Sequence, residues 1–261
     1  MYPALRAAWS AHPPQIVFSA HGDTCFHEST CLYVPGSGDA LYFGHMDNFA
    51  GVFALMSAHF SCMLPKNRVQ CRVTHGEESG KFEGAREVMV VLRLQDFVVV
   101  IDVTGQCPRK VNEVTVTEAP RVIGHVLFEK VSHNEKILRL IEKLPGQLIA
   151  IDGVPQSAPY SNDLTPPPYT YEIWHHCNDP QATLDETDAY LETQENVVFL
   201  GVTTTGGVWK GMESTGDYNA GPVFCWKRDI ESVSRAVVDL ANVFVECTDS
   251  GKEKGDEKEV G

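Results

Sequence analysis

The stretch "DFVVVIDVTG" (96–105) is the strongest indication of the fold, because it is a nearly unbroken run of β-branched and aromatic residues. Such a run is typical of a strand in a parallel sheet whose two faces are both covered. Earlier in the chain, three shorter runs predict further strands, over 14–20, 40–44 and 68–74. Residues 48–64 and 83–95 have helical spacing and fall between these strands. This alternation predicts an α/β fold, a three-layer sandwich with a mixed, largely parallel central sheet.

The second half of the chain continues this pattern less regularly. Strands are expected over 112–119, 125–131, 147–154 and 196–207, and helices over 133–144, 185–194 and 229–246. Residues 155–170 are rich in proline and polar residues and are expected to form a loop. The last stretch, 247–261, is charged and poor in apolar residues, and is expected to be a disordered tail. We therefore expect a single α/β domain over 1–246.

Composition excludes several classes of function. The chain of 261 residues carries a formal net charge of −14, which argues against a nucleic-acid partner and against an anionic membrane surface. Its eight cysteines form no C-x-x-C pair, so reduced thiols in a cytoplasmic protein are expected. We find no signal-peptide pattern and no apolar stretch long enough to span a bilayer. The sequence does not indicate an oligomeric state.

Side chains of the kind that bind metals follow or end the expected strands. These are His21 and Asp23, then Asp47, then Glu77 and Glu78, and finally Asp102. They recur at intervals of about one strand-plus-helix unit. Ligands of open parallel sheets bind outside the carboxyl ends of the strands, so these side chains are expected to meet at one edge of the sheet.

The residue types suit a hydrolase with two metal ions. Zinc binds neutral imidazole and carboxylate oxygen, and one carboxylate can bridge two ions. A carboxylate that does not bind metal can take the proton of the attacking water. Neighbouring side chains diverge, so Glu77 and Glu78 can divide these two tasks. Asp23 could hold the second ring nitrogen of His21.

Four motifs, "SAHGD", "GHMDNFAGVFAL", "THGEESGKFEGAR" and "VVVIDVTG", resemble in this order the co-catalytic zinc aminopeptidase, carboxypeptidase and amino-acid deacylase superfamily. The chain looks most like the lid-less, single-domain aminopeptidases, although little sequence precedes its first strand. The resemblance implies that His21 binds one zinc ion, that Asp47 bridges the two ions, and that Glu78 binds one ion and Asp102 the other. It also implies that Glu77 is the general base and that Asp23 orients His21.

The sequence departs from the family pattern at "WKGMESTGDYNAGP" (209–222), where Glu213 stands at the position of an expected histidine. Because glutamate oxygen can bind zinc, Glu213 is a candidate fifth ligand. His175 and His176 are alternative donors, but they come too early in the chain. The second ion is therefore bound by Glu213, bound differently, or not bound.

The resemblance implies a zinc-dependent hydrolase that acts on a peptide or an acylated amino acid, as an aminopeptidase, another exopeptidase or an amino-acid N-deacylase. One alternative is an inactive homologue that binds a peptide or protein partner. Another is a structural α/β domain in which Glu77 and Glu78 only begin a helix. His45 is interpreted as a neighbour of the site, and Asp185 and Asp188 as caps of the helix expected over 185–194.

Overall fold

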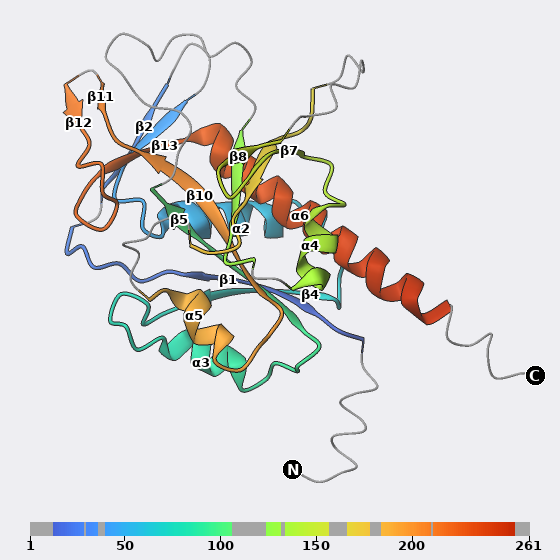
Figure 1. Ribbon diagram of the computed structural model, residues 1–261. Helices are drawn as coiled ribbons and strands as arrows, with labels where there is room; N and C mark the ends of the chain where they lie inside the picture. Colours follow the sequence, from blue (N-terminus) through green and yellow to red (C-terminus); the bar gives the residue numbers. More distant parts are fainter. Residues whose placement is uncertain are drawn as a thin grey trace, which may run out of the picture.

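The computed structural model describes residues 13–28, 30–35, 40–105, 124–131, 134–156, 166–177, 184–209 and 211–253. These residues form an α/β structure with an eleven-stranded sheet and a separate two-stranded sheet (Figure 1). The strand expected over 112–119 lies outside the described residues. No helix of the described part is long and apolar enough to cross a membrane.

One half of the large sheet is parallel. It contains four neighbouring strands in the order β4 (Val69–Thr74), β1 (Ile16–His21), β5 (Phe97–Thr104) and β10 (Val197–Thr205). The sequence "DFVVVIDVTG" forms β5, which is buried along its whole length between β1 and β10. The expectation drawn from its apolar run is confirmed.

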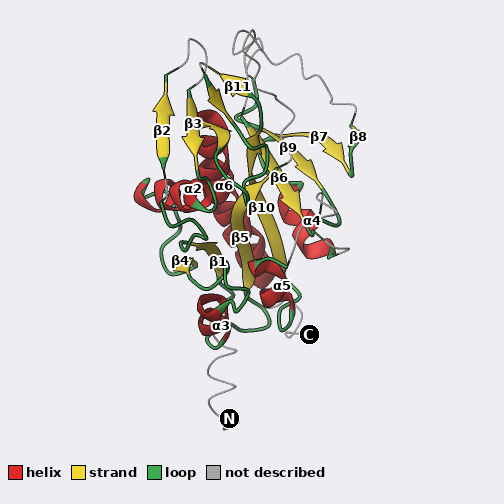
Figure 2. Cartoon of the chain, turned by 90° about the vertical axis from the view of Figure 1, so that its left-hand side faces the viewer, coloured by secondary structure: helices red, strands yellow, loops and turns green. Residues whose placement is uncertain are grey.

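The other half of the sheet is mixed. On its free edge β10 pairs antiparallel with two strands, β6 (His125–Glu129) and β13 (Val223–Trp226). The sheet continues from β6 through parallel β9 (Thr170–Ile173) and β7 (Gln147–Ile151) to the short β8 (Val154–Pro155). From β13 it continues antiparallel through β3 (Leu41–Gly44) to the edge strand β2 (Cys31–Val34). In Figure 2, β2 and β7 lie towards opposite ends of the row of strands.

The expected α/β class is confirmed, but the expectation of a largely parallel sheet is wrong. The large sheet has as many antiparallel strand pairs as parallel ones. Four of the five antiparallel pairs involve short strands at 31–34, 154–155 and 223–226, which are too brief to give a clear apolar pattern. A two-stranded sheet of β11 (Val208–Trp209) and β12 (Met212–Glu213) follows β10.

Helices cover both faces of the parallel strands. On one face lie α2 (Phe49–Phe60) and α6 (Lys227–Glu253), together with α4 (Glu135–Ile141). On the other face lie α3 (Glu83–Met89) and α5 (Glu186–Leu191), which contact each other (Figures 1 and 2). The alternation in β1 explains this, since Phe18 packs with the first group of helices and Val17 with the second.

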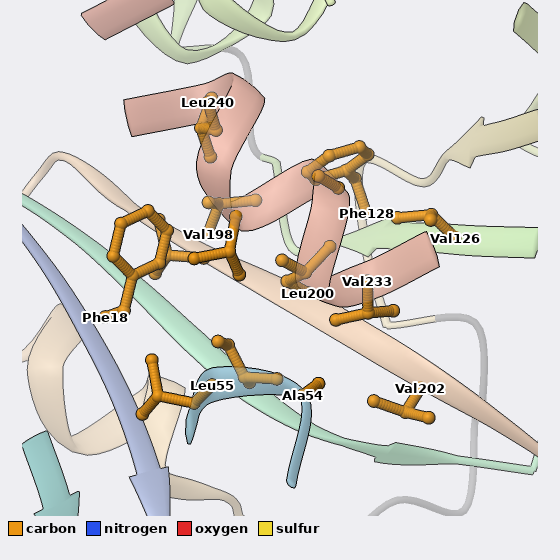
Figure 3. Packing of buried hydrophobic residues seen from close by; sticks show 14 of the residues in the cluster. Phe18, Ala54, Leu55, Val126, Phe128, Val198, Leu200, Val202, Val233 and Leu240 are labelled. Carbon is orange, nitrogen blue, oxygen red and sulfur yellow. The ribbon is translucent and has the colours of Figure 1, made fainter. Parts of the chain in front are cut away.

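The main core lies between the sheet and the pair α2 and α6. Figure 3 shows Phe18, Val198 and Leu200 of the sheet facing side chains of both helices. Leu55 of α2 and Leu240 of α6 are fully buried there. These close contacts fix the ends of β1 and β5, where the candidate site lies.

Two helix boundaries differ from those expected. Helix α3 ends at Met89 instead of continuing to residue 95, because the chain turns there towards β5. Helix α6 continues to Glu253, so the expectation of a disordered tail from residue 247 is wrong for 247–253. Arg68 explains the extension in part: it donates hydrogen bonds to Thr248 and to Asp249 at 2.7 Å.

Candidate metal centre

The centre lies where three parallel strands end at the same edge of the sheet. His21 is the last residue of β1, and its register partner Thr74 is the last residue of β4. The turn after β4 carries Glu77 and Glu78, and β5 carries Asp102. Asp47 comes just before α2. The structure therefore brings together five of the predicted site residues from four separate segments.

The imidazole of His21 is the centre of this cluster. Its Nε2 atom lies 3.1 Å from Asp47 Oδ1, 3.3 Å from Asp102 Oδ2 and 3.9 Å from Glu77 Oε2. The His21 side chain is only 1% exposed. Despite the short distances, His21 Nε2 and Asp47 Oδ1 are buried without a hydrogen-bond partner, and so is Glu78 Oε1. Buried polar atoms normally have such partners, so these atoms are suited to binding something else.

The donor atoms form two overlapping groups. One contains His21, Glu77 and Asp102, the other His21, Asp47 and Glu78, and within each group the donor atoms lie within 4.8 Å of one another. The cluster could hold a metal ion, and its imidazole and carboxylate donors suit zinc and several other divalent ions. The residues present therefore fit the kind of ligand set that the sequence predicts.

The ionisable side chains of the cluster have strongly shifted pKa values when no cation is bound. Burial lowers the pKa of His21, but the negative charges of the nearby Asp102 and Asp47 outweigh it and raise the pKa to about 12. Burial, followed by the charge of Asp102, raises the pKa of Glu77 to about 8. Burial also raises the pKa of Asp102. A bound cation would relieve the repulsion among these carboxylates.

Asn48 fixes the position of Asp47. Its side-chain oxygen accepts from Gly51 N at 2.9 Å and caps α2, while its side-chain nitrogen donates to Ile101 O at 2.8 Å. The second bond joins the start of α2 to the residue before Asp102. Asp102 itself is oriented by the backbone, because its Oδ1 accepts from Val103 N at 2.7 Å.

Asp23 contacts the second ring nitrogen of His21, chiefly through its backbone. The backbone oxygen of Asp23 lies 3.2 Å from His21 Nδ1 and orients the ring, whereas the carboxylate is 3.6 Å away. The Asp23 carboxylate instead accepts from Gly76 N at 3.0 Å and Glu78 N at 3.3 Å. It therefore ties the loop after β1 to the turn that carries Glu77 and Glu78. Gly76, with φ of +82°, allows that turn.

Glu213 does not reach the cluster. It lies on β12, pairs with Val208 of β11 and is exposed. It belongs to neither donor group among the described residues and does not line the chamber beside them. The structure therefore gives no support to Glu213 as the fifth ligand. The alternative donor His175 is bonded to Asp152, with 2.6 Å between His175 Nδ1 and Asp152 Oδ2.

A chamber of about 1000 Å³ opens beside the cluster. Besides four of the clustered carboxylates, it is lined by Cys25, Glu129, Asp185 and Asp217. Sequence reasoning missed Cys25, Glu129 and Asp217. Asp217 lies in the same stretch as Glu213, and Glu129 ends a strand as the other site residues do. The sequence therefore contained a reason to consider each of these two residues. Nothing in the sequence distinguishes Cys25 from the other scattered cysteines.

No protein-family model matches the chain, and no curated protein matches it significantly.

Proposed function

We propose that the protein is a zinc-dependent hydrolase that cleaves amide bonds, an aminopeptidase related to the co-catalytic zinc superfamily. One observation carries the proposal: the buried Nε2 of His21 faces Asp47 and Asp102 within 3.3 Å, with no hydrogen bond and with Glu77 at 3.9 Å. The helices on both faces of the sheet are compatible with the sandwich fold of that superfamily. The free thiols among the described cysteines are compatible with a cytoplasmic location.

The ligands divide between two ions as follows. His21 and Asp102 would hold the first ion, Glu78 would hold the second, and Asp47 would be shared by both. When bound, such ions lower the pKa of a water molecule and polarise the carbonyl of the scissile amide. Asp23 and Asn48 keep the ligands in place through the hydrogen bonds described above.

Glu77 is the proposed general base. It lies at the cluster but needs no place among the ligands, because His21, Asp47, Asp102 and Glu78 supply the donors. Its half-buried carboxylate takes a proton from the attacking water and transfers it to the leaving amine. The raised pKa of about 8 shows how strongly its surroundings favour the protonated form when no cation is present.

The chamber favours a substrate with a free amino group. Beyond the clustered carboxylates, its walls carry Glu129 and Asp217, together with Asp185, which is paired with Lys130. The described lining residues include no Lys or Arg. Acidic walls attract the ammonium group of a peptide N-terminus and repel a carboxylate. An amino-acid N-deacylase or a carboxypeptidase must bind a substrate carboxylate, so these two activities fit the chamber less well than an aminopeptidase does.

The first test measures bound zinc per chain and hydrolysis of a panel of aminoacyl-anilides by wild type and Glu77→Gln. We expect the variant to retain zinc and lose activity by a factor of about 10²–10⁴, the usual contribution of a general base. Glu87→Gln is the matched control, because Glu87 is exposed on α3 and should leave both quantities unchanged. A wild-type protein that binds no zinc tightly and hydrolyses nothing in the panel would refute the proposal.

A second candidate is a non-catalytic homologue that binds a peptide or a protein. The observation in its favour is the position of Glu213, which leaves the second ion without its expected fifth ligand. The same experiment separates the two functions, since tight binding of one ion without turnover would support the non-catalytic protein.

A further inference from the structure

The second ion of the proposed centre has too few ligands. A histidine supplies one Nε2 atom, and that atom lies between Asp47 and Asp102, so it belongs to the first ion. Only Asp47 and Glu78 then remain for the second ion within the two described donor groups. Catalytic zinc sites generally have three protein ligands, so one more donor is needed.

Cys25 lies beside these two carboxylates. It lines the same chamber as Asp47 and Glu78. Burial and the charge of Asp47 raise the pKa of Glu78, while hydrogen bonds from the Cys25 backbone N–H and thiol partly oppose that rise. Burial, followed by the charges of Glu78 and Asp47, raises the pKa of the Cys25 thiol. Cys25 is therefore in contact with one ligand and near the other.

The position of Cys25 is set by the same loop that orients His21. Cys25 follows Asp23 by two residues, and the Asp23 carboxylate binds the backbone of Gly76 and Glu78. The loop after β1 is thus fastened to the turn that carries Glu78. The Cys25 side chain is exposed, so it can turn from Glu78 towards Asp47 without disturbing the core.

A second observation points to a cation at this place. Asp47 is 6% exposed, its Oδ1 atom has no hydrogen-bond partner, and it faces the chamber. Glu78 Oε1 is likewise buried without a partner. In the described conformation the Cys25 thiol belongs to neither donor group, so it joins Asp47 and Glu78 only after its side chain turns towards Asp47. Two carboxylate oxygens and a thiolate then form a donor set that suits zinc or cobalt, because these ions bind thiolate as well as carboxylate.

We propose that Cys25 is the third protein ligand of the second ion, replacing the histidine that the sequence lacks at Glu213. This inference rests on the proposed function for the existence of a second ion. It assigns the ligand set Asp47, Glu78 and Cys25 to that ion. It also makes occupancy of the second position sensitive to modification of one thiol.

Cobalt(II) titration of the full chain tests this assignment, because thiolate bound to cobalt gives a charge-transfer absorption in the near ultraviolet. We expect this absorption to appear with the second equivalent in wild type and to be absent in Cys25→Ser. The variant should bind the second ion more weakly by on the order of 10- to 100-fold or more, with the first ion unchanged. Cys177→Ser is the matched control, since Cys177 lines the same chamber and the absorption should persist.

Two further measurements make the test independent of folding and of activity. Cys25→His should restore binding of the second ion without the thiolate absorption. In wild type, the second equivalent should protect Cys25 from iodoacetamide while Cys31 and Cys62, which are exposed elsewhere, still react. A second ion that binds without thiolate absorption, or equally well in Cys25→Ser, would overturn the assignment, as would a wild type that binds one ion only.

These outcomes differ from a failure of the proposed function. Hydrolysis that depends on Glu77 and persists with one ion would leave the function standing and refute the role of Cys25. A thiolate-bound second ion in a protein that hydrolyses no substrate would support the role of Cys25 and refute the hydrolase.

Discussion

At the scale of single residues, the candidate metal centre contains side chains whose pKa values are strongly raised. His21 and Glu77 both retain protons at a higher pH in the folded protein than free side chains do. Each retained proton reduces the repulsion among the carboxylates of the cluster. The same residues that would bind metal are therefore expected to make the metal-free protein sensitive to pH.

The pH dependence of the metal-free protein follows from these two groups. The contribution of His21 to the free energy of unfolding is complete below its ordinary pKa of 6.5 and is lost as pH rises towards about 12. The contribution of Glu77 is complete below 4.5 and is lost as pH rises through about 8. Between pH 6.5 and 8 the folded state binds more protons than the unfolded state, so the free energy of unfolding should fall as pH rises.

Urea unfolding without metal, at several pH values across this window, checks the prediction. The midpoint should decrease with pH in wild type and change less in His21→Gln. In His59→Gln, where the lost side chain is exposed on α2, it should follow wild type. Added zinc should stabilise wild type increasingly as pH rises, because the ion displaces protons. A wild-type midpoint that rises across the window would contradict the assignment of these shifts.

At the scale of elements, Lys130 joins the end of β6 to the start of α5. Its Nζ atom lies 2.8 Å from Asp185 Oδ2 and 2.9 Å from Asp188 Oδ2. Burial lowers the pKa of Lys130, but the two carboxylates outweigh it and raise the pKa. Asp185 and Asp188 also form the capping box of α5, as the sequence predicts. One cation thus stabilises a six-residue helix beside the chamber.

Replacement of Lys130 should loosen this helix. In Lys130→Met the two carboxylates lose their cation while still partly buried, so we expect a loss of about 1–3 kcal/mol in the free energy of unfolding. Hydrogen exchange should accelerate in α5 before it does in β10. Lys136→Met, at an exposed position of α4, is the control and should change stability little. Unchanged exchange in α5 would show that the capping box alone holds the helix.

The length of each strand or helix decided whether the sequence could predict it. The apolar run of β5 and the helical spacing of α2 gave both elements within a few residues. The four-residue strands β2, β9 and β13 lack enough residues to show a period, so their pairing was not foreseen. The residues at strand ends were predicted because topology alone brings them together. The contact of Cys25 with Glu78 depends on how a loop folds, which no residue pattern encodes.

At the scale of the whole molecule, α6 connects the two halves of the sheet. It packs against β6, β10, β13 and α2, and the core includes Val237, Leu240, Ala241 and Phe244 from its middle turns. Beyond residue 246 the contacts are fewer, and the described ones include the hydrogen bonds of Arg68 to Thr248 and Asp249. The helix therefore consists of a segment up to residue 246 that contributes to the core and a C-terminal extension beyond it.

Two shortened chains test this division. A chain that ends at Arg235 loses six buried apolar residues, and the larger ones, Val237, Val238, Leu240 and Phe244, are each worth about 1.5–3 kcal/mol. Their sum approaches the total stability of a typical domain. We expect this chain not to fold. A chain that ends at Glu246 loses mainly the contacts of Arg68, worth about 1 kcal/mol or less, and should fold with a slightly lower melting temperature. Circular dichroism during heating measures both. Cooperative melting of the shorter chain would contradict the proposed division.

The position of β10 has a consequence for synthesis of the protein on the ribosome. This strand lies between β5 and the pair β6 and β13. The two halves of the sheet therefore cannot join until residues 197–205 have emerged. Until then β5 exposes an apolar edge that can pair with other chains. The nascent protein must therefore wait for its last segments before it can fold, and it is expected to depend on chaperones during translation.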